Sequence, residues 1–308
     1  MKKIIVADYY GVCMGVKRAI SMTEKTSHQG KNVTIFREIV HNEAIVEKFR
    51  SEGVGQAKSI ENIDGGTVII PAHGASPDIF KKAVEKGLDV VDATCPLVIR
   101  IHKIIGKLAS AGYQILHFGD SEHDETIGIV GHAPERVKVI ADISELEKIE
   151  SACDKVALTA QTTASIADFT KIEKDARKKF PQIEVFNTIC NATSQRQAAI
   201  TKLAPMVNIM LVVGSKSSAN SNRLVQISRT FCNRAYLIDS AGEINPEWFE
   251  DENGQIDVVG LSAGASTPDF LIEGAIEKLK EFSRSQVELV YPEKKPDENE
   301  LALKNSPL

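Results

Sequence analysis

The sequence predicts an α/β fold, a trefoil-like assembly of three pseudo-equivalent α/β domains, each with a small, mostly parallel sheet. Strand-like runs alternate with helix-like runs along the 308 residues, a pattern typical of parallel sheets with crossover helices. The same strand, turn and helix plan also returns three times, at a period of about 90 residues, which indicates repeated structural units.

The first repeated element places a cysteine between a strand and a helix. It reads VADYYGVCMGVKRAI, VVDATCPLVIRIHKI and VFNTICNATSQRQAAI, and its cysteines are 82 and 95 residues apart: Cys13, Cys95 and Cys190. The chain has five cysteines but no CxxC pair, which argues against a disulfide framework and against common zinc and thioredoxin motifs. Cys153 and Cys232 lie outside the repeat, and we interpret them as small buried hydrophobic residues.

The second repeated element is a strand, a polar loop and a helix, in VTIFREIVHNEAIVEKF, YQILHFGDSEHDETIGIV and NIMLVVGSKSSANSNRLVQI. One loop position lies 28 residues after each cysteine, and it is occupied by His41, His123 and Ser218. The third element, in VIIPAHGASPDIF, VALTAQTTASIADF and VVGLSAGASTPDF, aligns on Ala72, Ala160 and Ala263. Its distance from the cysteine varies between the repeats, as surface insertions allow.

These repeats predict the domain boundaries. Repeat 1 covers residues 14–95, repeat 2 covers 96–190, and repeat 3 covers 191–290. The third repeat ends in QVELVYPEKK, an apparent strand with no cysteine after it, so we expect the N-terminal strand 1–13 to complete it. Residues 291–308 are charged and contain proline, and we predict a mobile tail there.

Composition excludes several classes of function. The net charge of −5 and the lack of a long basic run argue against a nucleic-acid partner. No apolar run approaches the roughly 20 residues that a membrane helix needs. The N-terminal MKKIIVADYYG is too short and too soon polar for a signal peptide. We therefore expect no membrane partner and a cytoplasmic protein.

Three equivalent domains arranged about an axis would bring the three repeated cysteines together. Thiolates without a matching histidine suit a soft metal centre, and structural zinc normally takes four protein ligands. A cubane iron–sulfur cluster held by three cysteines fits better and leaves one iron open to substrate. An open iron is a Lewis acid as well as an electron donor. The competing interpretation is that the cysteines are ordinary buried residues.

Polar side chains at the predicted strand-to-helix turns indicate an anion site. Helix N-termini attract anions, and histidines, hydroxyls and an amide there suit phosphate or diphosphate. The candidates are His41, His73, His123, Ser217, Ser218, Asn220 and Ser266. Taken singly, a histidine here is more often a surface residue or helix cap, and the serines and asparagine could be N-caps. Their return at the same loop position in three repeats favours function.

Glu125 is the candidate proton carrier, because a carboxylic acid beside an anion pocket and a metal can relay protons. It is equally an ordinary first-turn glutamate, which the helix dipole favours. Thr162 and Thr163 either bind a substrate hydroxyl or cap the following helix. His28, His102 and His117 lie outside the pattern and are interpreted as structural.

Taken together, these motifs resemble one family. GVCMGVKRAI, IVHN, AHGAS, DATCPLV, EHDE, AQTT, TICNATSQRQ, VVGSKSSANSNRL and AGASTPDF run in order from about residue 4 to residue 280. They are similar to the motifs of the 4-hydroxy-3-methylbut-2-enyl diphosphate reductases, the IspH or LytB family. The resemblance implies a trefoil of three α/β domains around a central [4Fe–4S] cluster. It also implies the last step of the non-mevalonate isoprenoid route, which gives isopentenyl and dimethylallyl diphosphate.

The resemblance further implies roles for residues. Cys13, Cys95 and Cys190 would be the cluster ligands, Glu125 would deliver the proton, and Thr162 would orient the hydroxyl or a water. The diphosphate would be held by His41, His73, His123, Ser218, Asn220 and Ser266. Electrons would come from a ferredoxin or flavodoxin, because no flavin or nicotinamide motif occurs in the chain.

Two departures from the family pattern stand out. Ala219 replaces a serine, which removes one diphosphate contact unless a water or Ser217 substitutes for it, and DYYGVC replaces a segment with proline and arginine before the cysteine. Two alternatives to the reductase stay open, and Ala219 is a hint only for the second. One is an iron–sulfur hydro-lyase that needs no net electrons, and the other is a non-catalytic diphosphate-binding or redox-sensing paralogue.

Overall fold

The computed structural model describes residues 1–29, 32–150, 154–250, 256–283 and 286–291. Cys153 and the predicted tail from residue 292 onward lie outside the described residues. Within them, the strands form three parallel sheets, which confirms the predicted α/β class. The chain divides into two compact units. Unit 1 comprises Met1–Met14, His41–Glu43 and Asn191–Leu308, and unit 2 comprises Gly15–Val40 and Ala44–Cys190.

Unit 1 contains a five-stranded sheet, sheet A. Its strands lie in the order β11 (Ala235–Ile238), β10 (Ile209–Val213), β12 (Val258–Ala263), β1 (Lys3–Val6) and β13 (Glu288–Val290). β1 runs parallel to β12, with Lys3 opposite Val258 and Val6 opposite Leu261. The N-terminal strand therefore belongs to the sheet built by residues 209–263, although it is hundreds of residues away in sequence.

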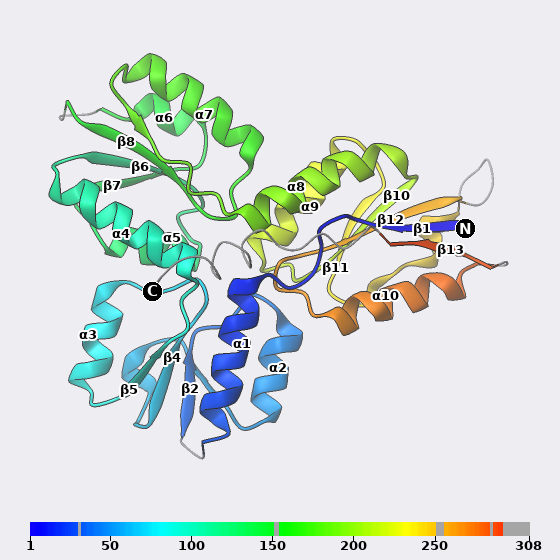
Figure 1. The fold of residues 1–308 in the computed structure, drawn as a ribbon, viewed down its shortest axis with the longest axis horizontal. Helices are drawn as coiled ribbons and strands as arrows, with labels where there is room; N and C mark the ends of the chain where they lie inside the picture. Colours follow the sequence, from blue (N-terminus) through cyan, green and yellow to red (C-terminus); the bar gives the residue numbers. More distant parts are fainter. Residues whose placement is uncertain (30–31, 151–153, 251–255, 284–285, 292–308) are drawn as a thin grey trace, which may run out of the picture. The chain divides into compact units, whose positions relative to one another are not determined.

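Helices cover both faces of sheet A, as Figure 1 shows. They are α8 (Asn191–Leu203) and α9 (Ala219–Arg229) on one face and α10 (Asp269–Glu281) on the other. Side chains alternate along a strand, so Met210 and Val212 pack in the cluster that contains α8 and α9, whereas Leu211 and Val213 pack in the cluster that contains α10. Burial on both faces explains why β10 reads IMLVV without a polar residue.

Unit 2 contains two four-stranded parallel sheets. Sheet B has the order β3 (Gly55–Ala57), β2 (Val33–Phe36), β4 (Thr67–Ile70) and β5 (Asp89–Asp92). Sheet C has the order β7 (Val137–Ile140), β6 (Gln114–Phe118), β8 (Val156–Ala160) and β9 (Glu184–Val185). The two central strands of sheet B are β2 and β4, and those of sheet C are β6 and β8. They occupy the second and third places in their sheets, as β10 and β12 do in sheet A.

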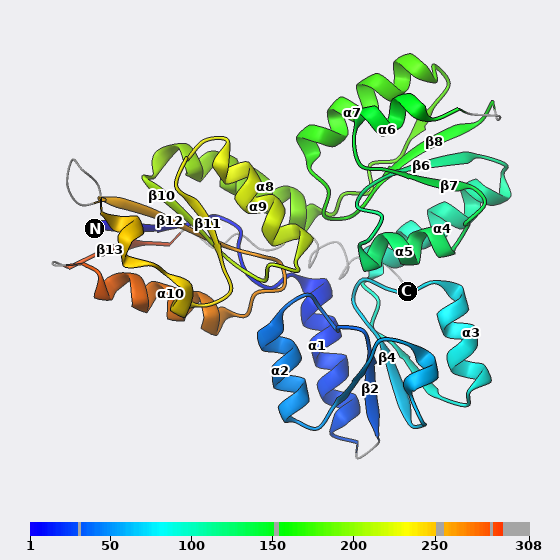
Figure 2. The same cartoon turned by 180° about the vertical axis from the view of Figure 1, so that it is seen from behind.

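The helices of unit 2 lie on both faces of its sheets (Figure 2). They are α1 (Met14–Ser27), α2 (Glu43–Ser51), α3 (Pro77–Glu85), α4 (Pro96–Ser110), α5 (Asp124–Gly131), α6 (Ile143–Lys148) and α7 (Ile166–Lys179). On sheet C, Leu116 packs with α7 through Phe169, while its neighbour Ile115 packs with α4 and α5 through Ile105 and Ile129. Sheet C is therefore the middle layer of an α/β/α sandwich. Short 3-10 helices lie at Ile60–Asn62, Ala204–Met206, Ala241–Glu243 and Pro246–Phe249.

A close approach inside unit 2 depends on a glycine. A Cβ atom built on Gly131, the last residue of α5, would lie 2.2 Å from the Cβ atom of Ser76, which precedes α3. Real Cβ atoms do not approach this closely, so only glycine lets α5 lie against the turn after β4. This contact joins the helix that carries Glu125 to the loop that carries His73.

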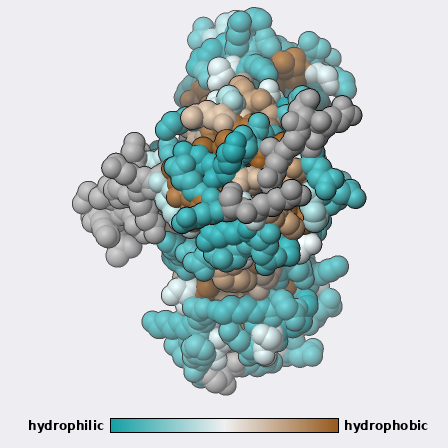
Figure 3. Space-filling model, turned by 90° about the vertical axis from the view of Figure 1, so that its right-hand side faces the viewer, coloured by the Kyte–Doolittle hydropathy of each residue, from teal (hydrophilic) through white to brown (hydrophobic). Residues whose placement is uncertain are grey.

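Polar residues dominate the visible exterior. Hydrophilic residues make up most of the face drawn in Figure 3. Among the described residues, no helix has both the length and the apolar character that crossing a bilayer requires.

Candidate functional site

The three repeated cysteines occupy the same position in their turns. The backbone N–H of each cysteine donates to a carbonyl oxygen in the turn after the neighbouring strand, at 2.9 Å for Cys13, 2.9 Å for Cys95 and 3.1 Å for Cys190. The three acceptors are Ala265, Ala72 and Thr162. Each acceptor is the second residue after the end of its strand, β12, β4 or β8.

This equivalence corrects the sequence alignment of the third element. The alignment on Ala72, Ala160 and Ala263 is wrong by two residues, because Ala160 and Ala263 are the last residues of their strands, whereas β4 already ends at Ile70. The equivalent residues are Ala72, Thr162 and Ala265. The alignment of the second element is correct. His41, His123 and Ser218 are each the fifth residue after their strand, β2, β6 or β10.

The cysteine turns suit an anionic group. The three cysteines form no disulfide and are partly exposed. The helices that follow them, α1, α4 and α8, have no acidic residue in the first turn. α9 also has none, whereas α2, α3, α5, α6, α7 and α10 each have at least one. The positive ends of these three helix dipoles therefore lack the usual carboxylate beside the cysteines. Thiolates, and a cluster bound to them, would supply the missing negative charge.

Cys232 differs from these three. It is buried, and its Sγ lies 3.5 Å from the carbonyl oxygens of Asn208 and Arg234. This environment agrees with the interpretation of Cys232 as a packing residue.

Glu125 is a buried carboxylate with only 3 % of its surface exposed. One oxygen, Oε1, accepts the backbone N–H of Thr162 at 2.7 Å, and the other, Oε2, accepts the Thr162 hydroxyl at 2.5 Å. The carbonyl of the same Thr162 accepts the N–H of Cys190. The carboxylate is thus tied through one residue to a cysteine turn.

His123 caps the helix that begins with Asp124 and Glu125. Its Nδ1 accepts the backbone N–H of Glu125 at 3.1 Å. A nitrogen that accepts carries no proton, so the proton of a neutral ring lies on Nε2, which makes Nε2 a hydrogen-bond donor. The local fold therefore sets the tautomer of His123.

His73 lies beside a carboxylate that sequence reasoning missed. Its Nε2 is 3.3 Å from Oδ2 of Asp124, and the other oxygen of Asp124 forms an ion pair with Arg37. Arg37 has a φ of 58°, which is unusual for a residue with a side chain, and its N–H donates to Ala57 at 2.8 Å. His73 and Asp124 therefore lie in contact beside the turn that follows β4, and an imidazole N–H can bind a phosphate oxygen.

In unit 1, the first turn of α9 (Ala219–Arg229) contains a buried amide, that of Asn220. Asn220 is only 4 % exposed, and neither its Oδ1 nor its Nδ2 has a hydrogen-bond partner among the described residues. Leaving a buried amide unpaired is costly. Ser218, the N-cap of α9, accepts the N–H of Ser221 at 3.3 Å. Asn220 is therefore prepared to bind a polar group.

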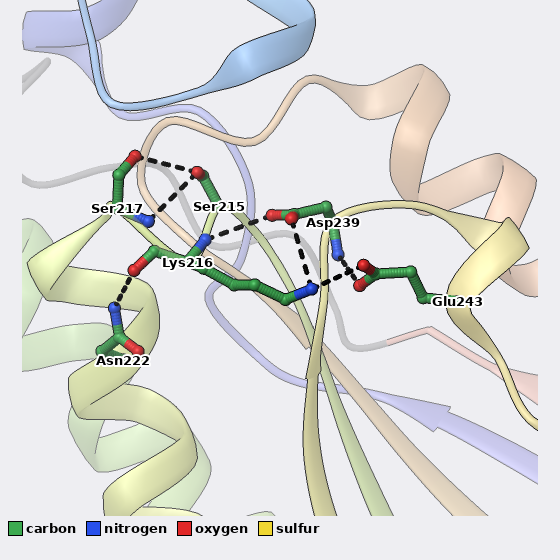
Figure 4. A network of polar contacts seen from close by, with 6 residues as sticks. All are labelled: Ser215, Lys216, Ser217, Asn222, Asp239 and Glu243. Carbon is green, nitrogen blue, oxygen red and sulfur yellow. Dashed lines mark hydrogen bonds and ion pairs between the residues drawn. The ribbon is translucent and has the colours of Figure 1, made fainter.

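The loop from Ser215 to Ser218 is held from both sides, as Figure 4 shows. Asn222 donates to the carbonyl of Lys216 at 2.7 Å, and the Lys216 N–H donates to Asp239 at 3.1 Å. The Lys216 ammonium reaches Glu243 at 2.6 Å. These contacts fix the loop without using the hydroxyl of Ser217, which instead lies 2.9 Å from that of Ser215 (Figure 4).

Two further candidates, Ser266 and His41, form a hydrogen bond in unit 1. The hydroxyl of Ser266 donates to the backbone carbonyl of His41 at 3.0 Å, and Ser266 is buried. Ser266 therefore positions the histidine loop that follows β2.

The structure thus gathers the predicted residues into two sets, one in each unit. Unit 2 holds Cys95, Cys190, His73, His123, Glu125 and Thr162, and unit 1 holds Cys13, His41, Ser217, Ser218, Asn220 and Ser266. Sequence reasoning missed Asp124 and Arg37. The only sign of Asp124 was its place between His123 and Glu125, and nothing in the sequence indicated that Arg37 would pair with it.

The chain is similar to proteins of a known family. Residues 4–280 match the family described as LytB protein. The chain is 38 % identical over 279 residues to the 4-hydroxy-3-methylbut-2-enyl diphosphate reductase of Campylobacter hominis, covering 90 % of this chain and 98 % of that one. It is 37 % identical to the enzyme of the same name from Halalkalibacterium halodurans, over 92 % of this chain and 93 % of that one.

Two solved structures are similar as well. The E-1-hydroxy-2-methyl-but-2-enyl-4-diphosphate reductase of Plasmodium falciparum has a TM-score of 0.88 at 28 % identity, covering 98 % of both chains. A second structure is described as (E)-4-hydroxy-3-methyl-but-2-enyl diphosphate reductase, the terminal enzyme of the non-mevalonate pathway. It has a TM-score of 0.65 at 36 % identity, covering 91 % of this chain and 100 % of that one.

Proposed function

Because the chain belongs to the LytB protein family, we propose that it is the reductase that acts on 4-hydroxy-3-methylbut-2-enyl diphosphate in non-mevalonate isoprenoid biosynthesis. The reaction consumes two electrons and two protons. It breaks the bond between carbon and the allylic hydroxyl, which leaves as water, and it gives isopentenyl and dimethylallyl diphosphate. Two products arise because the new C–H bond can form at either end of the allylic system.

A [4Fe–4S] cluster is the proposed cofactor, held by Cys13, Cys95 and Cys190. The equivalence of their three turns and the lack of first-turn acids in α1, α4 and α8 support this ligand set. With three protein ligands, the cluster would supply an iron open to the substrate oxygen, together with the electrons for the reaction.

The proposed diphosphate ligands are His41, His73, His123, Ser217, Ser218, Asn220 and Ser266. Their chemistry supports the assignment. His123 has a donor on Nε2, His73 lies 3.3 Å from Asp124, and the amide of Asn220 is buried without a partner in the described part of the chain. Fixed donors that hold the diphosphate orient the allylic hydroxyl for reaction.

Glu125 is the proposed proton donor and Thr162 its partner. A carboxylic acid can transfer a proton to the departing oxygen through the Thr162 hydroxyl, because that hydroxyl lies 2.5 Å from Oε2. The burial of Glu125 restricts bulk water around this path. This hydrogen-bonded pair, anchored to the Cys190 turn, is the single observation that carries the proposed chemistry.

A ferredoxin or flavodoxin is the proposed electron donor, because the sequence contains no fingerprint for a flavin or nicotinamide site. We also propose that the enzyme works in the cytoplasm, where thiols stay reduced and remain able to bind a cluster.

The test is anaerobic purification, followed by measurement of iron, sulfide and reductant-dependent conversion of the hydroxylated allylic diphosphate. We expect about four irons per chain and both products only when a reductant is present. Turnover without a reductant would instead establish the hydro-lyase. A cluster without turnover would favour a sensing or binding paralogue, with Ala219 as the first residue to examine. Failure to take up a cluster would overturn the proposed cofactor.

A further inference from the structure

Each repeated cysteine is followed by an arginine one helical turn or more into the next helix. Arg18 and Arg100 are the fifth residues after Cys13 and Cys95, and Arg196 is the sixth after Cys190. The proposed function uses none of the three. Arg18 and Arg196 contact the backbone near a cysteine, whereas Arg100 is exposed.

Arg18, on α1, holds the backbone in front of one cysteine. Its guanidinium donates to the carbonyl oxygen of Thr94 at 3.1 Å, and Thr94 directly precedes Cys95. Both residues belong to unit 2. The side chain of Asp92 fixes the same turn, since it accepts the N–H of Thr94 at 3.0 Å.

Arg196, on α8, holds the backbone in front of Cys13 in unit 1. One nitrogen of its guanidinium donates to the Gly11 carbonyl at 2.5 Å, and another donates to the Ala192 carbonyl at 2.8 Å. Gly11 lies two residues before Cys13 and has a φ of 73°, a conformation that favours glycine. The planar guanidinium thus bridges a helix to a cysteine turn with two directed bonds.

Arg196 is also a buried charge, with only 4 % of its surface exposed. Its contacts among the described residues are to neutral carbonyls, and its Nε has no hydrogen-bond partner there. A buried cation without an anion is costly. The first turn of α8 adds no acid, so the protein around Arg196 is electrostatically prepared for an anion.

The second repeat provides an internal contrast. Arg100 is exposed, and no hydrogen bond from it occurs within the described chain. The segment before Cys190 is held instead by Thr188, which accepts the N–H of Ala160 at 2.8 Å, and by Asn187, which accepts the N–H of Ile189 at 3.1 Å. Of the three arginines, Arg18 and Arg196 therefore each hold a cysteine turn, whereas Arg100 is a surface residue.

We propose that Arg18 and Arg196 are positioning residues for the iron–sulfur cluster, a role that rests on the cofactor of the proposed function. Each fixes the backbone ahead of one cysteine and places a positive charge at that cysteine's turn. Positive charge near a cluster favours its reduced form, and a rigid turn slows the loss of iron from its ligand. Arg100 has neither role.

The test compares Arg18→Gln, Arg196→Gln and Arg196→Lys with the matched control Arg100→Gln. Each full-length protein is reconstituted anaerobically. Its iron and sulfide contents, the midpoint potential of the cluster by a redox titration followed by electron paramagnetic resonance, and the rate of iron loss to a chelator are then measured. Urea unfolding of each cluster-free protein reports separately on the stability of the fold.

We expect both glutamine variants to have a more negative midpoint potential than the wild type and to lose iron several-fold faster. Arg196→Lys keeps the charge but cannot make both directed bonds, so its potential should stay near the wild-type value while its iron loss quickens. Arg100→Gln should match the wild type in all three measurements.

The inference is overturned if Arg18→Gln and Arg196→Gln match Arg100→Gln in potential and iron loss, even if their cluster-free forms unfold more easily. Should Arg196→Gln fail to fold, the partly exposed Arg18→Gln decides the question by itself. A wild-type protein that takes up no cluster would overturn the proposed cofactor, and this inference with it.

Discussion

Glu125 is buried and hydrogen-bonds to Thr162, whose carbonyl accepts the N–H of Cys190. Both of its oxygens accept hydrogen bonds from Thr162, so its side chain has one well-defined orientation. A glutamate that merely caps a helix would need no such partner, because the dipole alone stabilises it in the first turn. The pairing therefore favours the chemical role over the structural one.

Replacing Glu125 by glutamine keeps the shape of the side chain but removes the transferable proton. We expect kcat to fall by about 100-fold or more with a modest change in KM, the range typical of a lost general acid. Steady-state kinetics with a chemical reductant would check this. The control is Glu122→Gln, which changes an exposed acid in the same loop. A kcat for Glu125→Gln within a few-fold of the Glu122→Gln value would rule out the proton relay.

Ala219 is the one departure within the proposed diphosphate site. It is the first residue of α9, directly after the N-cap Ser218, and the hydroxyl of the neighbouring Ser217 lies 2.9 Å from that of Ser215. Ser217 therefore shares one hydrogen bond with Ser215, which limits how far its hydroxyl can replace a missing one.

Ala219→Ser should restore a hydrogen bond to a charged phosphate. Such bonds contribute about 1.5–3 kcal/mol, so we expect KM to fall about ten- to a hundred-fold with little change in kcat. The matched control is Ala219→Val, which adds volume without a hydroxyl and should not lower KM. An unchanged KM in Ala219→Ser would mean that the diphosphate does not reach this turn.

The turns after β10 and β12 are shaped around one side chain of α9. Cβ atoms built on Gly214 and Gly264 would lie 2.3 Å and 2.1 Å from the Oγ atom of Ser221. The two strands pair in register, with Val213 opposite Ala263. Glycine at both strand ends is therefore what lets α9 begin so close to the sheet.

This packing predicts that Ser221→Ala restores the stability lost on substituting Gly264 but not that lost on substituting Gly214. Gly264→Ala should lower the free energy of unfolding by about 1–3 kcal/mol through overpacking. Adding Ser221→Ala should restore most of it, because the nearest remaining Ser221 atom, Cβ, would be 3.3 Å away. The cluster-free protein and urea denaturation suffice for the measurement.

Gly214→Ala is the control, because its Cβ would still lie 2.9 Å from the Cβ of Ser221 after the hydroxyl is removed. We expect no rescue there. Equal rescue at both glycines would show that the turns relax and that Ser221 does not define them.

The pH dependence of stability is a property of the whole molecule. Burial lowers the pKa of His117 from 6.5 to about 3. Burial, followed by the nearby His132, lowers the pKa of His102 to about 3 as well, and the rings of His102 and His132 stack at 4.0 Å. Below pH 6.5 these two histidines bind protons in the unfolded chain but stay neutral in the folded protein until the pH approaches 3. The stability that these two neutral histidines contribute is therefore fully present above pH 6.5 and is lost as the pH falls toward 3.

Each such histidine contributes a slope of up to about 1.4 kcal/mol per pH unit below 6.5. For His102 we expect a loss of about 2 kcal/mol between pH 7.5 and pH 5, and His102→Asn should remove this part of the slope. Urea midpoints of the cluster-free protein across this pH range provide the measurement. His28→Asn, at an exposed position, should leave the slope unchanged. A slope that survives in His102→Asn would contradict the assignment.

Much of the fold followed from the repeats in the sequence. The parallel sheets and the equivalence of His41, His123 and Ser218 were predictable because equal spacing in equal units reproduces equal turns. The third element was misaligned, because Ala160 and Ala263 match Ala72 in letter but not in their distance from the strand end. Residue identity alone does not say where a strand stops.

The sequence by itself determined the α/β class, the three cysteine turns and the residue types around them, because these depend on local periodicity and on spacing within one repeat. Only the tertiary structure decided which side chains meet across elements. It paired Glu125 with Thr162, placed Asp124 between Arg37 and His73, and set Arg18 and Arg196 against cysteine turns. Such contacts join residues far apart in the chain, and they are set by strand order and helix packing, which no local pattern encodes.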